Sequence, residues 1–175
     1  VLIGGQGIGK STFAVRLLPP ELRCYYLDHI NFSNKFDMEM ALTSNLFVNI
    51  DEFNMMTSRQ QTKLKQVLSK VKVNGRPIFG RVQADRPRYA SFIATTNDAT
   101  PLCDPTGSRR YICILIPDEA YIDNATPIDY GQLYAQVIHQ LKAEELPYWF
   151  DNIQVERIQE LNMPFYKSED MSEMI

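Results

Sequence analysis

The chain has 175 residues, of which 45% are hydrophobic and 22% are charged, and its formal net charge is −3. These values suit one domain with a sizeable core, or one domain with a small appendage. No apolar run approaches the roughly 20 residues that a membrane helix needs, no secretory signal pattern is present, and the three cysteines lack metal-type spacing, so we expect a cytoplasmic protein without a membrane partner.

The first dozen residues carry the most specific motif of the sequence. Residues 4–11, Gly-Gly-Gln-Gly-Ile-Gly-Lys-Ser, fit the Walker A pattern G-x-x-x-x-G-K-[ST]. An apolar run, Val1–Ile3, precedes the motif, and a helical pattern containing Phe13 and Leu17 follows it. This is the strand–loop–helix context that a phosphate-binding loop requires.

These residue types suit the binding of a nucleoside triphosphate. Glycines let the backbone N–H groups point inward around a phosphate, and the following helix adds the positive end of its dipole. Lys10 would contact the β- and γ-phosphates, and the Ser11 hydroxyl would bind Mg²⁺. The sequence therefore predicts ATP and Mg²⁺ as cofactors, although a glycine-rich turn can match by accident. The predicted loop residues are Gly5, Gln6, Gly7, Ile8, Gly9, Lys10, Ser11 and Thr12.

Two further strands are expected in the first third of the chain. Residues 23–27 form a short aromatic run, and residues 45–50 form a continuous apolar run of the kind found in buried parallel strands. The second run ends at Asp51 and Glu52, which resembles a Walker B arrangement. Asp51 would hold Mg²⁺ and Glu52 would polarise the attacking water. The alternative is a solvated acidic pair at the end of a strand.

Residues 57–88 form a strongly basic segment. Thr57 and Gln60 have capping-box spacing before an amphipathic helix, and Asn74-Gly75 predicts a hairpin turn. Between Arg59 and Arg88 the sequence has nine basic residues and one acidic residue. Such a concentration of one charge favours contact with a nucleic acid over a merely solvated face. The candidate residues are Lys70, Lys72, Arg76, Arg81, Arg86 and Arg88.

A fourth strand, residues 90–96, ends at Asn97, and a fifth strand, residues 111–116, follows Arg109 and Arg110. Asn97 would hydrogen-bond the γ-phosphate or the attacking water, unless it is a simple turn residue. The two arginines are either surface charges or a source of guanidinium for the nucleotide of a neighbouring subunit.

Beyond Pro117 the sequence becomes acidic and helical. From Tyr111 to the end there are twelve acidic and three basic residues. One helix is expected from Asp129, with an apolar face, and a weaker one over residues 152–161. We therefore expect an ATPase core over residues 1–117 and a helical appendage over 118–175, packed on that core. The chain opens inside a strand and without methionine, so we expect it to belong to a longer protein. The expected apolar face comprises Leu133, Tyr134, Val137, Ile138 and Leu141.

Five strands joined by crossovers predict an α/β fold with a parallel sheet flanked by helices. The ordered set GGQGIGKST, LFVNIDE, basic helix and hairpin, FIATTN and GSRRY resembles the virulence-associated protein E (VirE) family of P-loop ATPases. That family is allied to the superfamily 3 helicases within the AAA+ class. The resemblance extends into the helical C-terminal part.

This resemblance implies several roles. Asn97 would be the sensor-1 residue. Arg109 or Arg110 would be the arginine finger, which acts across the interface of a hexameric ring. The hairpin would bind single-stranded DNA. Family members accompany primases, which implies a role in replication or on mobile elements. A DNA-dependent ATPase motor is the leading hypothesis. A nucleotide-dependent switch or scaffold and a P-loop small-molecule kinase are the alternatives.

Overall fold

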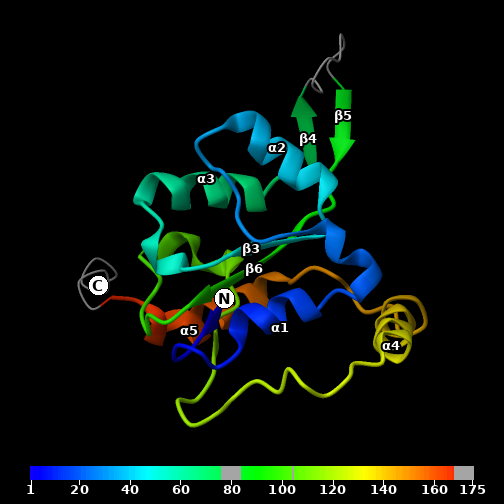
Figure 1. Cartoon of the computed structure of the whole chain (residues 1–175). Coiled ribbons are helices and arrows are strands. Elements are labelled where there is room, and N and C mark those ends of the chain that lie inside the picture. Colours follow the sequence, from blue (N-terminus) through cyan, green and yellow to red (C-terminus); the bar gives the residue numbers. More distant parts are fainter. Residues whose placement is uncertain (76–83, 104, 168–175) are drawn as a thin grey trace.

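A five-stranded parallel sheet forms the centre of the computed structural model, which describes residues 1–75, 84–103 and 105–167 (Figure 1). The strands lie in the order β2-β3-β6-β1-β7, and every pair in the sheet is parallel. The predicted α/β fold with its five strands is thereby confirmed. The strands are β1 (Leu2–Ile3), β2 (Tyr26–Leu27), β3 (Phe47–Ile50), β6 (Ser91–Thr96) and β7 (Ile114–Leu115).

Helices cover both faces of this sheet. In Figure 1, α2 (Lys35–Ser44) and α3 (Ser58–Leu68) lie above it, while α1 (Lys10–Arg16) and α5 (Asn152–Asn162) lie below it. The capping box expected at Thr57 and Gln60 is formed and begins α3. Short 3₁₀ helices occur at η1 (Pro20–Tyr25), η2 (Phe53–Met55), η3 (Pro105–Arg110) and η4 (Met163–Phe165).

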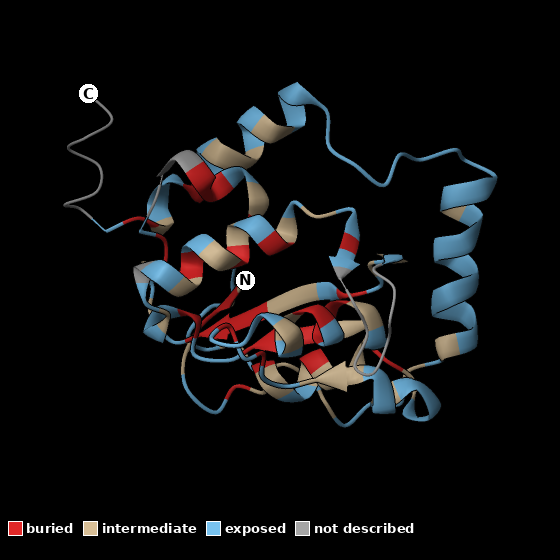
Figure 2. Ribbon diagram, turned by 90° about the horizontal axis from the view of Figure 1, so that it is seen from above, coloured by how far each residue is buried: buried red, intermediate tan, exposed pale blue. Residues whose placement is uncertain are grey.

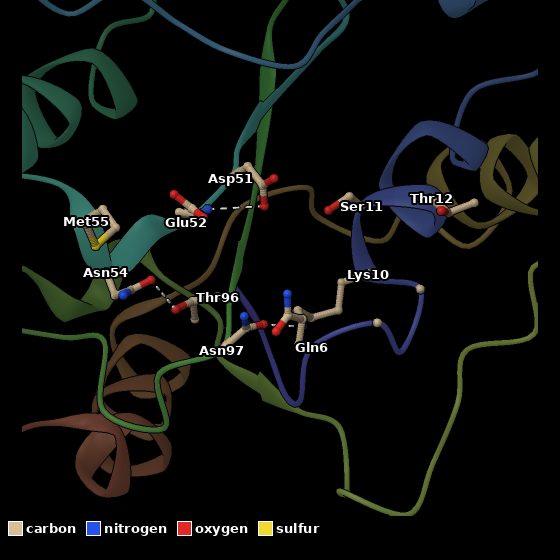
Figure 3. A pocket seen from close by; sticks show the side chains of 12 residues that line it. Gln6, Lys10, Ser11, Thr12, Asp51, Glu52, Asn54, Met55, Thr96 and Asn97 are labelled. Carbon is tan, nitrogen blue, oxygen red and sulfur yellow. Dashed lines mark hydrogen bonds between the residues drawn. The ribbon is translucent and has the colours of Figure 1, made fainter.

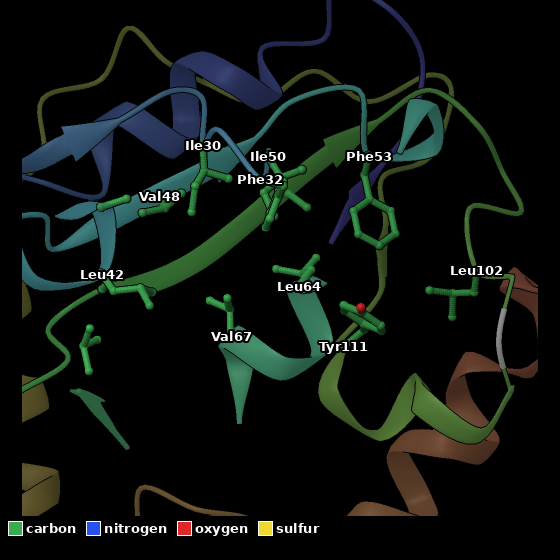
Figure 4. Close-up of a cluster of buried hydrophobic side chains, with 14 of the residues drawn as sticks. Ile30, Phe32, Leu42, Val48, Ile50, Phe53, Leu64, Val67, Leu102 and Tyr111 are labelled. Carbon is green, nitrogen blue, oxygen red and sulfur yellow. The ribbon is translucent and has the colours of Figure 1, made fainter. Parts of the chain in front are cut away.

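The main hydrophobic core lies between the sheet and the pair α2 and α3 (Figure 4). Val48 of β3 and Leu42 of α2 are fully buried, and Leu64 and Val67 of α3 are 1% exposed. Because helices cover both faces of the sheet, β3 needs apolar residues on both of its sides, which explains why Phe47, Val48 and Ile50 are apolar. The buried Asn49 is the exception, and its amide donates to the Asp28 carboxylate at 3.1 Å.

The basic segment forms a small antiparallel pair of strands, β4 (Lys72–Gly75) and β5 (Ala84–Pro87). The expected turn at Asn74-Gly75 is wrong, because both residues belong to β4. Burial of Val73 fixes the pairing register, and the Asn74 side chain donates a hydrogen bond of 2.8 Å to Asp85 across the pair. The connection therefore falls within residues 76–83, which lie outside the described residues.

The two C-terminal helices differ in how they attach to the core. α5 packs on η3, where the buried Asn162 donates to the carbonyls of Ser108 and Tyr111. α4 (Tyr130–Lys142) is exposed along most of its length and stands at one side of the sheet (Figure 2). Tyr130 and Tyr134 tie it to the end of α1 by their hydroxyl groups. Its apolar face, expected to pack on the core, is 36–51% exposed.

The expectation of a core-packed appendage is thus met by α5 and wrong for α4. The reason is that α4 contacts the rest of the protein through the hydroxyl groups of Tyr130 and Tyr134, while its aliphatic residues remain partly exposed. None of the described helices combines the length and apolar character needed to cross a bilayer.

Candidate active site

A cavity of about 470 Å³ lies at the carboxyl ends of three parallel strands, β1, β3 and β6 (Figure 3). Ligands of open α/β sheets bind at this edge, beside a strand whose neighbours come from different parts of the chain. Here β1 lies between β6 and β7. The lining residues are Gln6, Gly7, Gly9, Lys10, Ser11, Thr12, Asp51, Glu52, Asn54, Met55, Thr96 and Asn97.

The loop after β1 adopts a backbone that depends on glycine. Gly7 and Gly9 have φ angles of 78° and 94°, in a region that side chains with a Cβ rarely enter. A Cβ at Gly9 would also meet the side-chain amide nitrogen of Asn124. Ser11 and Thr12 follow in the first turn of α1, so their backbone N–H groups lie at the start of that helix. Gly5 and Ile8 belong to the same loop but do not line the cavity.

Lys10 is buried at the floor of this loop. Its ammonium donates to the carbonyls of Gly4 at 2.8 Å and Gly5 at 2.6 Å, and to the Asn97 side-chain oxygen at 2.9 Å. Burial lowers the pKa of Lys10 below its ordinary value, and the charge of Asp51 partly opposes this shift. The ammonium is therefore held in place at the edge of the cavity.

Asp51 and Glu52 close the cavity from the end of β3 (Figure 3). Asp51 Oδ1 accepts hydrogen bonds from the Glu52 backbone N–H, at 3.1 Å, and from the Thr95 hydroxyl. Glu52 has left-handed backbone angles (φ 50°, ψ 49°), which cost a residue with a side chain about 1–3 kcal/mol. Such strain concentrates at functional positions, and here it turns the chain directly after the strand.

Three polar residues of the site were not predicted from the sequence. Thr95 binds Asp51, and Thr96 donates to the Asn54 side chain at 2.8 Å while accepting from the Asp98 N–H. Both threonines are at most 2% exposed. A buried hydroxyl needs a hydrogen-bonding partner, so two threonines in an otherwise apolar strand were a usable signal for a polar network at its end.

The oxygen donors of the cavity fit Mg²⁺. Magnesium prefers one or two carboxylates, with waters and substrate phosphates completing its octahedron. Ser11 and Asp51 both line the cavity and supply a hydroxyl and a carboxylate. Within the described ranges, no group of three or more His, Cys, Asp or Glu residues could hold a metal by itself.

The two predicted arginines lie outside this cavity, on η3. Arg109 is exposed, whereas Arg110 is half-buried and donates to the Ser69 hydroxyl at 3.0 Å. Arg110 also lines a separate, largely apolar cavity of about 200 Å³ with Leu64 and Tyr111. Neither arginine is therefore brought to the phosphate loop of its own chain.

The predicted DNA-binding residues differ among themselves. Arg88 donates to the carbonyls of Leu68, Lys70 and Ala90 and lies 5.7 Å from the centroid of the Phe92 ring.

The other basic residues of the segment occupy other environments. Arg86 contacts Glu39 and Thr43 of α2, while Lys72 is exposed beside Asp85 at 3.8 Å. Lys70 is half-buried. Arg76 and Arg81 lie outside the described residues.

Comparison with known proteins identifies the family. Two solved structures, an apo A form of the NrS-1 C-terminal region and an apo A form of its residues 305–718, are 16% and 14% identical to the chain, with TM-scores of 0.48 and 0.47. The chain aligns over 94% of its own length but spans only 34% of each of those chains. No curated protein matches it. Residues 1–167 match the virulence-associated protein E-like domain. The chain therefore belongs to the virulence-associated protein E-like family, as its motifs predicted.

Proposed function

We propose that the chain is an ATP-hydrolysing nucleic-acid motor of helicase type, which couples ATP hydrolysis to the binding or translocation of single-stranded DNA. The main support is one observation: the phosphate loop, the Asp51-Glu52 pair and Asn97 meet at a single cavity. Nucleotide binding is what the P-loop family implies. Replication or mobilisation of a mobile element is the setting that the family suggests.

The loop residues would bind the triphosphate. Gly5 to Thr12 supply backbone N–H groups, and the ammonium of Lys10 would contact the β- and γ-phosphates. Lys10 is bonded to two loop carbonyls and to Asn97. It is therefore oriented before nucleotide arrives, and little rotamer entropy is lost when it binds.

The two carboxylates have separable roles in this proposal. Asp51, oriented by Thr95 and by the Glu52 N–H, would hold Mg²⁺ together with Ser11. Bound Mg²⁺ would neutralise charge on the β- and γ-phosphate oxygens. The side-chain carboxylate of Glu52 lines the same cavity and takes no part in those bonds, so it would act as the base that orients water. Asn97, bonded to Lys10, would contact the γ-phosphate.

The hairpin would provide the contact with DNA. Lys70 and Lys72 lie at its base, and Arg76 and Arg81 lie between the two strands in the sequence, outside the described residues. Arg86 and Arg88 make internal contacts, so they would mainly hold the hairpin in place. Their charge would still add to the positive electrostatic potential around the hairpin. A basic element of this kind binds the phosphate backbone without reading its sequence.

The arginines would complete the active site of a neighbouring subunit. Arg109 and Arg110 do not line the cavity of their own chain, and an arginine finger supplied by another molecule increases hydrolysis by about 10³ to 10⁵. A homo-oligomer, a hexameric ring in the intact protein, follows from this. A primase domain or partner would act beside it, as in other family members.

Steady-state ATP hydrolysis, measured with and without single-stranded DNA over a range of protein concentrations, tests this proposal. The Lys10→Ala variant supplies the blank. Stimulation by DNA, with activity per subunit that rises with concentration, is the expected result. Turnover that is indifferent to DNA would contradict a motor and favour a nucleotide-dependent switch, whereas phosphate transfer to an added small molecule would favour a kinase.

A further inference from the structure

The turn that carries the two arginines, η3, is held rigidly from one side. Asn162 of α5 is 1% exposed and donates to the Ser108 carbonyl at 3.1 Å and to the Tyr111 carbonyl at 2.8 Å. Tyr111 N–H donates back to the Ser108 carbonyl at 2.8 Å. These bonds bracket Arg109 and Arg110, so the backbone of both residues is fixed at its two ends.

The two arginine side chains nevertheless have different surroundings. Arg109 is exposed, and no hydrogen bond or ion pair of its side chain occurs within the part of the chain that the structure describes. Arg110 is half-buried and its Nε donates to Ser69 Oγ at 3.0 Å. An arginine that must reach a phosphate on another molecule has to be extended and available, and only Arg109 meets that requirement here.

Ser69 connects Arg110 to the end of the basic helix. Ser69 is the C-cap of α3, and its hydroxyl donates to the Lys65 carbonyl at 3.1 Å while accepting from Arg110. The Lys65 side chain lies against Gly107 of η3, where an added Cβ would come within 2.6 Å of it. The last turn of α3 therefore contacts the arginine turn at two places.

The same end of α3 also carries the hairpin. Arg88, directly after β5, donates to the carbonyls of Leu68 and Lys70 at 2.9 and 3.0 Å. Residues 68–70 thus receive Arg88 from the hairpin and Arg110 from the arginine turn. Ser69 is the residue between the two that accept hydrogen bonds from Arg88. A displacement of the hairpin would therefore change the position of Ser69.

The arginine turn has a further contact toward the catalytic carboxylates. The ring of Tyr111 packs edge-on against Phe53, with 5.5 Å between the centroids, and both side chains are buried. Phe53 directly follows Glu52. Tyr111, which directly follows η3, therefore contacts the residue next to Glu52.

From these contacts we infer that Arg109 is the arginine that enters the neighbouring site, and that Arg110 and Ser69 are positioning residues that couple it to the hairpin. This inference rests on the proposed function and deepens it. DNA bound at the hairpin would fix the end of α3, and the bond from Ser69 to Arg110 would then hold η3 with Arg109 directed outward. Without the bond, hydrolysis would continue but would respond less to DNA.

The test compares the stimulation of ATP hydrolysis by single-stranded DNA, expressed as the ratio of the rates with and without DNA. Ser69→Ala should keep the DNA-free rate within about twofold and lower the ratio by about fivefold, the factor that one hydrogen bond of ordinary strength contributes. Ser69→Thr, which retains a hydroxyl, should restore the ratio. Ser44→Ala, an exposed serine at the end of α2, is the matched control and should behave as wild type.

A double-mutant cycle separates positioning from catalysis. Arg110→Met should lower the ratio as Ser69→Ala does, and the double variant should show no further loss, because both changes remove one interaction. Arg109→Met should reduce hydrolysis by about 10³ with or without DNA, and Arg109→Lys should not restore it, since lysine lacks the planar fork. Thermal unfolding and nucleotide binding of each variant check that it is folded.

Several results would overturn the inference while leaving the motor intact. They are wild-type stimulation in Ser69→Ala, multiplicative losses in the double variant, or a loss in Arg110→Met as large without DNA as that in Arg109→Met. A wild-type chain that hydrolyses ATP with no response to DNA would instead contradict the proposed function, and the inference with it.

Discussion

Two faces of the molecule are rich in polar and charged side chains, and they are built differently. On the phosphate-loop face, side chains from three strand ends converge on one cavity, and their hydrogen bonds run between neighbours within it. On the face formed by α3, the hairpin and η3, the basic residues are spread over separate elements. Some of them are bound internally and others are exposed.

The difference shows that charge alone does not assign a role. Lys10 and Arg88 are both basic and both make three hydrogen bonds, but Lys10 lines a cavity and Arg88 caps backbone carbonyls. Lys72 belongs to the same hairpin as Arg88 and is exposed. A substitution at a residue that lines the cavity should therefore mainly change ATP hydrolysis. A substitution at an internally bound basic residue such as Arg88 should mainly change the free energy of unfolding.

The largest expected effect lies on the phosphate-loop face. Glu52→Gln keeps the shape of the side chain but removes the base, so hydrolysis should fall by about 10² to 10⁴ while ATP binding remains. Single-turnover hydrolysis together with equilibrium binding of a fluorescent ATP analogue measures both. Glu119→Gln, an exposed glutamate, is the control. Equal loss of binding and hydrolysis would show that Glu52 positions the nucleotide instead.

On the face formed by α3, the hairpin and η3, Arg88→Met should act through stability. It removes charged donors from three carbonyls, two of them at the end of α3, and hydrogen bonds to charged groups contribute about 1.5–3 kcal/mol. We expect the free energy of unfolding to fall by about 2–3 kcal/mol. Lys72→Met, at an exposed pair with Asp85, should change it by less than about 1 kcal/mol. Urea unfolding measures both, and similar losses would remove the distinction drawn between these residues.

Binding of single-stranded DNA should depend on salt. If about four phosphates are neutralised, the logarithm of the affinity should fall against the logarithm of salt concentration with a slope near −3, at about −0.7 per contact. Lys72→Gln should make the slope less steep by about 0.7. Fluorescence anisotropy with a labelled oligonucleotide measures this slope. A flat response in the wild type would exclude phosphate contact as the purpose of the basic segment.

A smaller effect concerns the charge of Lys10. Because burial lowers its pKa, nucleotide affinity should decrease in alkaline solution before an ordinary lysine, at pKa 10.5, would lose its proton. A lowered pKa in the folded state means that the charged form is disfavoured there. The contribution of Lys10 to stability should therefore rise between the lowered pKa and 10.5, in the opposite direction to the affinity.

Both quantities can be followed against pH in the same samples. Nucleotide titrations report the affinity, and urea unfolding of the wild type against Lys10→Met reports the stability term. An affinity that stays constant up to pH 10.5 would show that the proton on Lys10 contributes little to binding.

The sequence predicted the phosphate-loop face better than the face formed by α3, the hairpin and η3. Glycine spacing and continuous apolar strands are local signals, and parallel strands necessarily bring their carboxyl ends to one edge, so Lys10, Asp51 and Asn97 were expected at one place. Thr95 and Thr96 were overlooked: two threonines at the end of a strand indicate a polar network there, but the sequence does not show which residues their hydroxyls contact.

The hairpin and the tail depended on tertiary contacts. Asn74-Gly75 has the composition of a turn, yet the burial of Val73 placed both residues within a strand. The period of apolar residues correctly predicted the helix α4. Periodicity cannot say whether an apolar face meets the core, and here that face is exposed.

The central claim is that Arg109 on one copy of the chain completes the nucleotide site of another copy. The most direct test of this claim is to mix two inactive variants. Lys10→Ala removes the nucleotide site but keeps Arg109, and Arg109→Ala does the reverse. If the arginine of one copy completes the site of another, ATP hydrolysis by the mixture should clearly exceed the sum of the separate rates. A mixture no more active than that sum would show that no site is shared between copies.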